Sequence, residues 1–146
     1  ALFKFTKAIL SGDPIDVYNC GNMRRDFTYI DDLVHGIRLL IDTIPDVQDN
    51  LLSDLAKIDS KSPVAPYRVV NIGNSRSEKL LDFISQIEIA VDVKAKMNLL
   101  PMQPGDVQST WADARLIKGL TNYMPKTEIS VGVKKFVEWY RNYYHV

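Results

Sequence analysis

The sequence is poor in the residues that build metal sites and disulfides. It contains one cysteine, Cys20, and two histidines, His35 and His145, among 146 residues. A single thiol excludes an intrachain disulfide framework and fits a reducing compartment, so we expect a cytoplasmic protein. The three side chains lie too far apart along the chain to indicate a metal site, because zinc ligands usually come in closely spaced pairs.

Net charge is also absent, since 18 Lys and Arg residues balance 18 Asp and Glu residues. A neutral chain has no long-range field that would attract nucleic acid or an anionic membrane, so any anion site must be local. No apolar run approaches the roughly 20 residues that a membrane helix needs. We therefore expect neither a nucleic acid nor a membrane as partner. The composition, 46% hydrophobic and 25% charged, is typical of a folded globular domain.

The motifs of dinucleotide binding and of catalysis are missing as well. The chain has no G-x-G-x-x-G or G-x-x-G-x-x-G, so no helix start is shaped to hold a dinucleotide pyrophosphate. A Tyr-x-x-x-Lys pair is also absent, and the nearest approach, Tyr123 to Lys126, is one residue too short and contains a proline. We expect this chain alone to bind no cofactor and to catalyse no reaction.

What is present is an alternation of helical and strand patterns. This alternation predicts an α/β fold, here a mixed α+β lobe, as a single domain over residues 1–146. Between residues 45 and 66 the periodicity weakens, which predicts a long loop with a helical turn at residues 51–58. Apolar spacing and breaker residues predict helices over 2–11, 31–41, 77–89, 113–120 and 131–143, strands over 15–18, 67–72 and 95–100, and a strand or extended segment over 26–30.

The first helix begins at the start of the chain. Its apolar stripe includes Leu2, Phe5 and Ile9, and no capping residue precedes it. We interpret Ala1 as an excision point within a larger protein. The alternative is a native chain with a processed start.

Two stretches carry side chains suited to binding. In residues 24–32, R-R-D-F-T-Y-I-D-D, the planar fork of Arg25 can clamp phosphate oxygens. Surface pairing of Arg25 with Asp26 or Asp32 would explain it equally well. In Gln103-Pro104-Gly105-Asp106, the carboxylate of Asp106 suits a vicinal diol such as a ribose. A plain turn remains the alternative there, because Pro-Gly-Asp is common in turns.

The order of these stretches carries more information than any one of them. I-D-V-Y, G-x-x-x-R-D-F-x-Y-I-D-D, Y-R-V-V-N-I-G-N-S, Q-P-G-D-V and W-A-D-A together resemble the extended short-chain dehydrogenase/reductase family. Within that family the chain is most similar to UDP-glucuronate 4-epimerases and their relatives in capsule and lipopolysaccharide synthesis. The resemblance implies the C-terminal, substrate-binding part of such an enzyme, whose N-terminal Rossmann domain holds NAD and the catalytic Tyr-x-x-x-Lys.

The resemblance also implies roles for individual residues. Arg25 corresponds to an arginine that binds the pyrophosphate, and Asp106 to a carboxylate that holds the uridine ribose. Tyr18 would border the uracil, and Asp16 would contact the base through its backbone. Gln103 stands where galactose-type epimerases carry a second phosphate-binding arginine, so Arg24 or the missing half would compensate, and a uronate is favoured over galactose. One ligand must reach all these groups, so we expect Arg25 and Asp106 on one side, facing a groove near Tyr18.

The mechanism that the resemblance implies is oxidation of the sugar at C4 by NAD, rotation of the 4-keto intermediate, and return of the hydride to the other face. The expected partners are a UDP-sugar, the missing Rossmann domain and a second copy in a homo-oligomer. Two alternatives stay open: a nucleotide-sugar dehydratase or decarboxylase that shares this lobe, and a binding or scaffold module without enzymatic activity.

Overall fold

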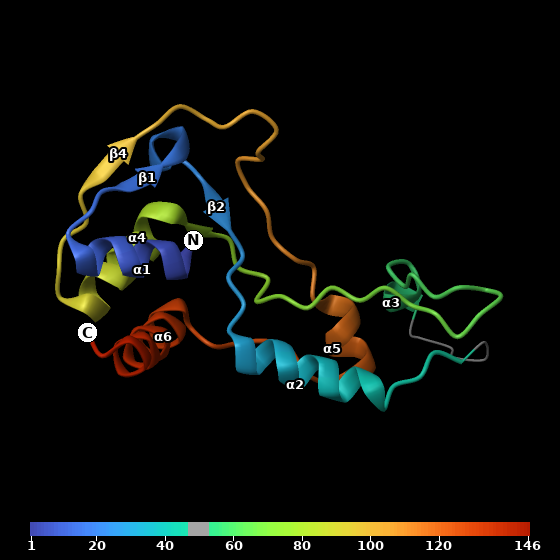
Figure 1. Cartoon of the computed structure of the whole chain (residues 1–146). Helices are drawn as coiled ribbons and strands as arrows, with labels where there is room; N and C mark the ends of the chain where they lie inside the picture. Colours follow the sequence, from blue (N-terminus) through green and yellow to red (C-terminus); the bar gives the residue numbers. More distant parts are fainter. Residues whose placement is uncertain (47–52) are drawn as a thin grey trace. The chain divides into compact units, whose positions relative to one another are not determined.

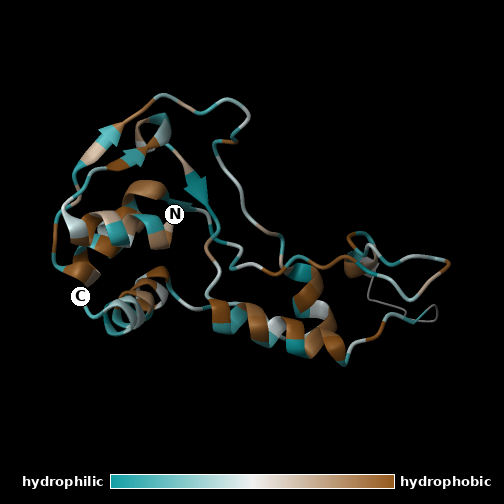
Figure 2. Ribbon diagram, viewed as in Figure 1, coloured by the Kyte–Doolittle hydropathy of each residue, from teal (hydrophilic) through white to brown (hydrophobic). Residues whose placement is uncertain are grey.

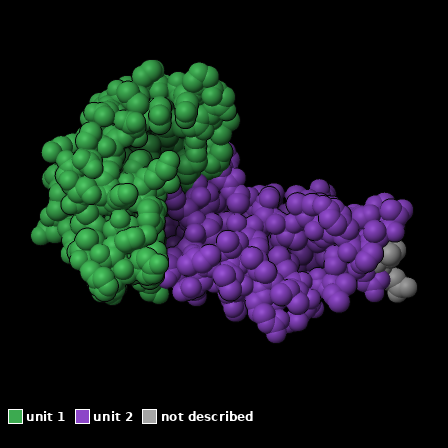
Figure 3. Space-filling model, viewed as in Figure 1, with its two compact units in different colours: residues 1–25, 77–110, 128–146 green, residues 26–76, 111–127 purple. Residues whose placement is uncertain are grey.

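The structure, a computed structural model, describes two compact units (Figure 3). Each unit is assembled from segments that are distant in sequence, so neither could have been recognised as one continuous stretch. The single domain expected over the whole chain stays a prediction. The described residues are 1–46 and 53–146; unit 1 comprises residues 1–25, 77–110 and 128–146, and unit 2 the described residues of 26–76 and 111–127.

Three helices form the core of unit 1 (Figure 1): α1 (Leu2–Ser11), α4 (Leu80–Val91) and α6 (Ile129–Tyr144). α4 packs against both α1 and α6, so its apolar face is covered from two sides. α1 ends at Gly12, whose φ of 72° suits glycine and lets its N–H reach the last carbonyls of the helix. The buried apolar side chains of the three helices are Ile9, Phe83, Ile84, Ile87, Val91, Val133, Val137 and Tyr140.

Two short sheets complete unit 1. β1 (Ile15–Val17) pairs in parallel with β4 (Met97–Leu99), and β2 (Arg24–Arg25) pairs antiparallel with β3 (Glu78–Lys79). In β1, Ile15 and Val17 are buried whereas Asp16 is exposed, as the two-residue period of a strand requires. A 3-10 helix, η1 (Tyr18–Gly21), joins β1 to β2.

Unit 2 contains α2 (Ile30–Ile41), α3 (Ser53–Ala56) and α5 (Arg115–Thr121). α5 packs against both α2 and α3. The close approach of α2 to its neighbours depends on the buried Gly36, because a Cβ there would lie 3.1 Å from Ile117 and 3.2 Å from Ile72. Among the described helices, none combines the length and the apolar composition needed to span a bilayer.

Two aspartates of the R-D-F-T-Y-I-D-D motif organise the loops of unit 2. The carboxylate of Asp26 accepts hydrogen bonds from the backbone N–H groups of Asn74, Ser75 and Ala112 at 2.9–3.1 Å. The carboxylate of Asp32 accepts hydrogen bonds from the N–H groups of Lys126 and Thr127 at 3.0 and 2.7 Å, and from the Tyr123 hydroxyl at 3.2 Å. Both carboxylates therefore tie together segments that are far apart in sequence.

The mixed α/β fold is confirmed, and the predicted helices are all present, with ends that differ from the prediction by at most three residues. The strand predicted over residues 67–72 is wrong, because this segment pairs with no strand in the described part of the chain. Its backbone is bonded to a loop instead: Val69 N–H donates to the Ser60 hydroxyl, and Ser62 N–H donates to the Tyr67 carbonyl. Val69 remains 54% exposed.

The extended segment predicted over residues 26–30 contains no strand either. The strand lies two residues earlier, at β2, because the Asp26 side chain takes up backbone donors of other segments and α2 already begins at Ile30. In the predicted loop over residues 45–66, α3 provides the helical turn expected near residues 51–58. Residues 47–52 of that loop lie outside the described residues.

Replacing Ile87 by alanine tests the core of unit 1. Ile87 is fully buried on α4, so Ile87→Ala should lower the free energy of unfolding by about 2–5 kcal/mol through lost burial and a residual cavity. Ile89, on the same helix, is 67% exposed, and Ile89→Ala should change it by less than about 0.5 kcal/mol. Urea titration measures both, and equal losses would contradict this packing.

The lowered pKa of Asp32 leads to a second prediction, on the stability of the fold. Burial raises this pKa, but the hydrogen bonds from Thr127, Lys126 and Tyr123 outweigh it and hold the pKa below the usual 3.8. The carboxylate therefore stabilises the fold above pH 3.8, and this contribution is lost as the pH falls through the lowered pKa. We expect Asp32→Asn to cost roughly 1–3 kcal/mol at pH 7.

The stability difference between wild type and Asp32→Asn should shrink as the pH is lowered below 4, because protonation also neutralises the wild-type carboxylate. Asp31→Asn is the matched control, since Asp31 is exposed on the same helix turn. Thermal unfolding followed from pH 7 to pH 3 measures the difference. A constant difference across this range would show that Asp32 does not act through its charge.

Candidate functional site

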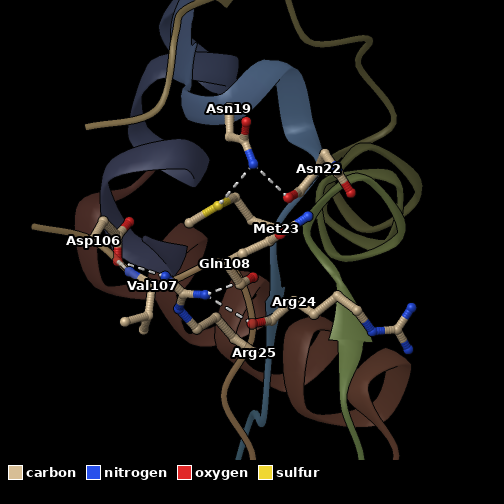
Figure 4. A network of polar contacts seen from close by, with 8 residues as sticks. All are labelled: Asn19, Asn22, Met23, Arg24, Arg25, Asp106, Val107 and Gln108. Atoms are coloured by element: carbon tan, nitrogen blue, oxygen red, sulfur yellow. Dashed lines mark hydrogen bonds and ion pairs between the residues drawn. The ribbon is translucent and has the colours of Figure 1, made fainter. Parts of the chain in front are cut away.

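The side chains of Arg25 and Asp106 meet on the surface of unit 1 (Figure 4). The Arg25 Nη2 donates to Asp106 Oδ1 at 2.7 Å, although the two residues are 81 positions apart in sequence. Both side chains are partly exposed, 28% for Arg25 and 36% for Asp106. Ion pairs with this exposure contribute little to stability, about 0–1 kcal/mol, so the fold does not depend on this pair.

Strand β2 positions the guanidinium of Arg25 beside the segment that follows Asp106. Arg25 Nη1 donates to the Gln108 carbonyl at 3.2 Å and to the Arg24 carbonyl at 2.8 Å. The backbone of β2 is bonded to the same segment, because Arg24 N–H donates to Gln108 O and Thr110 N–H donates to Arg24 O. These contacts fix the orientation of the planar fork, which is what bidentate anion binding requires.

A tight turn presents Asp106. The Asp106 N–H donates to the Gln103 carbonyl at 3.1 Å, and Gly105 at the third position has a φ of 81°. A positive φ there is typical of a type II turn, with proline at the second position and glycine at the third. The carboxylate Oδ1 also accepts a hydrogen bond from Val107 N–H at 2.8 Å. The sequence Q-P-G-D therefore forms the turn expected from its composition and aims its carboxylate at Arg25.

Arg24 is directed away from Arg25 (Figure 4), because consecutive residues of a strand point to opposite faces. Its guanidinium donates to the Ser77 carbonyl and, at 3.2 Å, to the Ser77 hydroxyl. The suggestion that Arg24 supplies a second phosphate-binding charge beside Arg25 is therefore wrong for this geometry. Asp26 and Asp32, the surface partners considered for Arg25, bind backbone N–H groups instead.

The other three predicted site residues lie in the same unit. Gln103 opens the turn that ends at Asp106 and is exposed. Asp16 lies opposite Asn98 in the β1–β4 ladder and accepts a hydrogen bond from its side-chain amide at 3.2 Å. Tyr18 is half-buried at the start of η1. Their roles toward a nucleotide stay predictions.

Sequence analysis missed the contribution of Gln108, whose backbone carbonyl orients Arg25. A carbonyl is present in every residue, so no residue type could have signalled it. It also missed Asn19, which has a φ of 51° and whose side chain donates to the Asn22 carbonyl at 2.8 Å. Asparagine tolerates this left-handed conformation, but no residue type in the N-C-G-N stretch indicates the hydrogen bond that closes the turn.

Tyr123 and His35 are held by contacts within unit 2. Tyr123, the nearest approach to a catalytic tyrosine, has its pKa raised to about 12 by burial and by the charge and hydrogen bond of Asp32. A base that works near neutral pH needs a shift in the opposite direction. His35 is exposed and lies edge-on against the Tyr123 ring, with ring centroids 4.6 Å apart. No group of acidic, histidine or cysteine side chains among the described residues could hold a metal.

Comparison with known proteins gives this surface a context. Residues 1–52 match the model of the NAD dependent epimerase/dehydratase family. The chain is 44% identical over 144 residues to a probable UDP-glucuronate 4-epimerase of Rhizobium meliloti and, equally, to protein CapI of Staphylococcus aureus. The crystal structure of UDP-glucuronic acid 4-epimerase from Bacillus cereus, in complex with UDP-glucuronic acid and NAD, matches with a TM-score of 0.77 at 28% identity.

The chain resembles the C-terminal part of these epimerases. The alignments cover 99% of this chain but 42% of each of the two relatives and 40% of the Bacillus cereus enzyme, so the chain spans about two fifths of their length. The family resemblance predicted from the sequence is thereby confirmed. The sequence contains neither G-x-G-x-x-G nor G-x-x-G-x-x-G, the motifs that hold a dinucleotide pyrophosphate at a helix start.

Proposed function

We propose that this chain is the substrate-binding part of an NAD-dependent nucleotide-sugar epimerase, with a UDP-uronate such as UDP-glucuronate as substrate. Its task is to hold the UDP moiety while the sugar is left free to turn. The observation that carries this proposal is the contact between Arg25 and Asp106, which brings a phosphate-binding and a diol-binding group together. We place the protein in the cytoplasm, because the one cysteine of this chain, Cys20, is free and exposed.

Arg25 is the diphosphate ligand in this proposal. Its guanidinium stays charged at any working pH and offers parallel N–H groups that match two phosphate oxygens. The hydrogen bonds to the Gln108 and Arg24 carbonyls use Nη1, so they fix the plane of the guanidinium from its Nη1 side. Fixed diphosphate contacts suit an epimerase, because the nucleotide must stay bound while the sugar changes the face that it presents.

Asp106 is the ribose ligand, since its two carboxylate oxygens can accept both hydroxyls of a vicinal diol. The base would lie along Asp16 and Tyr18. Gln103 would donate an amide hydrogen bond to the diphosphate without adding a positive charge. Galactose-type epimerases carry an arginine at this position, so the glutamine favours a uronate over galactose as the sugar.

The partner of unit 2 is, in this proposal, the cofactor-binding half found in the longer relatives. α2 presents a row of exposed apolar side chains with helical spacing, opposite the face that packs on α5, and Figure 2 shows its hydrophobic character. The segment over residues 67–72 adds an extended backbone without a strand partner in the described residues. The exposed fractions along α2 are 57% for Ile30, 55% for Val34, 47% for Ile37 and 64% for Ile41, followed by 74% for Ile44.

An exposed apolar row of this kind should make the isolated chain self-associate. We expect the double variant Val34→Gln and Ile41→Gln to reduce this association, because both side chains belong to the row and are more than half exposed. Ile89→Gln is the control, since Ile89 is as exposed but lies on α4. Sedimentation velocity over a range of concentrations measures it. A wild-type chain that stays monomeric at high concentration would contradict this use of α2.

The nucleotide-binding role is tested in a chimera that joins this chain to the N-terminal part of the Rhizobium meliloti relative. Arg25→Ala should remove charge-assisted hydrogen bonds worth roughly 1.5–3 kcal/mol. We expect KM for UDP-glucuronate to rise by about one to two orders of magnitude with kcat nearly unchanged, because the diphosphate is held equally in the ground and transition states.

Arg24→Ala is the matched control, because this neighbouring arginine carries the same charge but donates to Ser77. Its KM should stay within about twofold of the wild-type chimera. If Arg25→Ala and Arg24→Ala give the same kinetic constants as the wild type, Arg25 is a surface residue and the proposed role of this site is wrong.

A further inference from the structure

We propose that Arg25 and Asp106 form an ionic latch on the loop over residues 101–110, and that a diphosphate opens this latch by taking over the guanidinium. The identity of the natural ligand as UDP rests on the function proposed above. The latch itself rests only on how this loop is held in unit 1.

The two ends of the loop are fixed by backbone hydrogen bonds. At its start, Leu100 N–H donates to the Val17 carbonyl and the Leu100 carbonyl accepts from Cys20 N–H, each at 3.0 Å. At its end, Gln108 and Thr110 are bonded to the backbone of Arg24. All ten loop residues are exposed. The fixed points therefore enclose a stretch, residues 101–107, that lies on the surface.

One side-chain hydrogen bond joins this stretch to the rest of the unit. Among the hydrogen bonds of the described residues, the bond from Arg25 to Asp106 is the one that joins residues 101–107 to the remainder of unit 1. The other bonds of these residues stay within the turn, from Asp106 N–H to Gln103 O and from Val107 N–H to Asp106 Oδ1. Without the Arg25 bond, only these two internal bonds would hold the turn, so it should open more often.

The surroundings of the turn leave room for such a movement. A Cβ built on Gly105 would have no atom within 4 Å. The ion pair is partly exposed on both sides, so it is weak, and a multiply charged anion competes well for the same Nη2 edge. The guanidinium stays oriented during the exchange, because Nη1 keeps its bonds to the Gln108 and Arg24 carbonyls.

The latch gives Asp106 two opposite effects on binding. Toward a bare diphosphate, Asp106 is a competitor for Arg25. When a nucleoside diphosphate binds, the released Asp106 carboxylate can accept hydrogen bonds from the ribose hydroxyls. The turn is then held against the ligand. A ligand with both groups therefore closes the loop, whereas a diphosphate alone leaves it open.

The test compares inorganic pyrophosphate with UDP on this chain by isothermal titration calorimetry at constant ionic strength. Asp106→Asn should bind pyrophosphate about two- to fivefold more tightly than the wild type, which corresponds to removal of a partly exposed ion pair. The same variant should bind UDP no more tightly than the wild type. Asp13→Asn, which removes an exposed charge elsewhere in unit 1, should leave both affinities unchanged, and Arg25→Gln should abolish pyrophosphate binding.

Hydrogen exchange of the loop separates a latch from simple charge repulsion. Pyrophosphate should speed amide exchange at positions 106 and 107 in the wild type, because these two N–H groups are hydrogen-bonded within the turn, and both amides should already exchange fast in Asp106→Asn. The latch is overturned if Asp106→Asn does not tighten pyrophosphate binding, if pyrophosphate leaves exchange in the loop unchanged, or if Arg25→Gln still binds it. If these results hold but UDP binds no better than pyrophosphate, the latch stands and the proposed UDP role of Asp106 fails.

Discussion

The alternation of side chains along β2 decides what the candidate site can do. Two arginines follow one another, and the strand sends Arg24 toward Ser77 and Arg25 toward Asp106. The Arg24 guanidinium therefore links β2 to Ser77, which precedes α4. The Arg25 guanidinium does not take part in that link and contacts the Q-P-G-D turn instead. A shift of one residue in the register of β2 would exchange these roles, because neighbouring residues in a strand face opposite sides.

The register of β2 depends in turn on its backbone partners on both sides. It pairs antiparallel with β3 through Arg24–Lys79 and Arg25–Glu78, and Arg24 also bridges in parallel to Ser109. Immediately after β2, the Asp26 carboxylate collects three backbone N–H groups within unit 2. The R-D-F-T-Y-I-D-D motif thus contains a candidate ligand-binding residue, Arg25, and two structural carboxylates, Asp26 and Asp32.

Much of this fold could be predicted from the sequence, because its helices have clear apolar periodicity and clear ends. α1, with its Gly12 cap, and α6, with Val133 and Val137 on one face, follow directly from such patterns. The strand expected around Val69 could not be judged in this way. A β-rich run shows that a segment suits a sheet, but strand formation also needs a neighbouring strand, and the sequence of the segment does not contain that information.

The site was predictable to the level of residue types and no further. Arg25 and Asp106 could be named as candidates from their motifs, although the sequence explained Arg25 equally well by surface pairing and Asp106 by a plain turn. Their direct contact was not recognisable, because it depends on a bend at Gly105 and on the Gln108 carbonyl. Local sequence specified each half of the pair, and only the folded unit brought the halves together.

The central claim is that Arg25 and Asp106 bind the diphosphate and the ribose of one UDP molecule. A crystal structure of this chain joined to the N-terminal part of a relative, with UDP bound, tests this claim most directly. We predict hydrogen bonds from the Arg25 guanidinium to the diphosphate and from the ribose hydroxyls to Asp106, with the direct ion pair between the two residues broken. UDP bound elsewhere, with the Arg25–Asp106 pair still closed at 2.7 Å, would contradict the account.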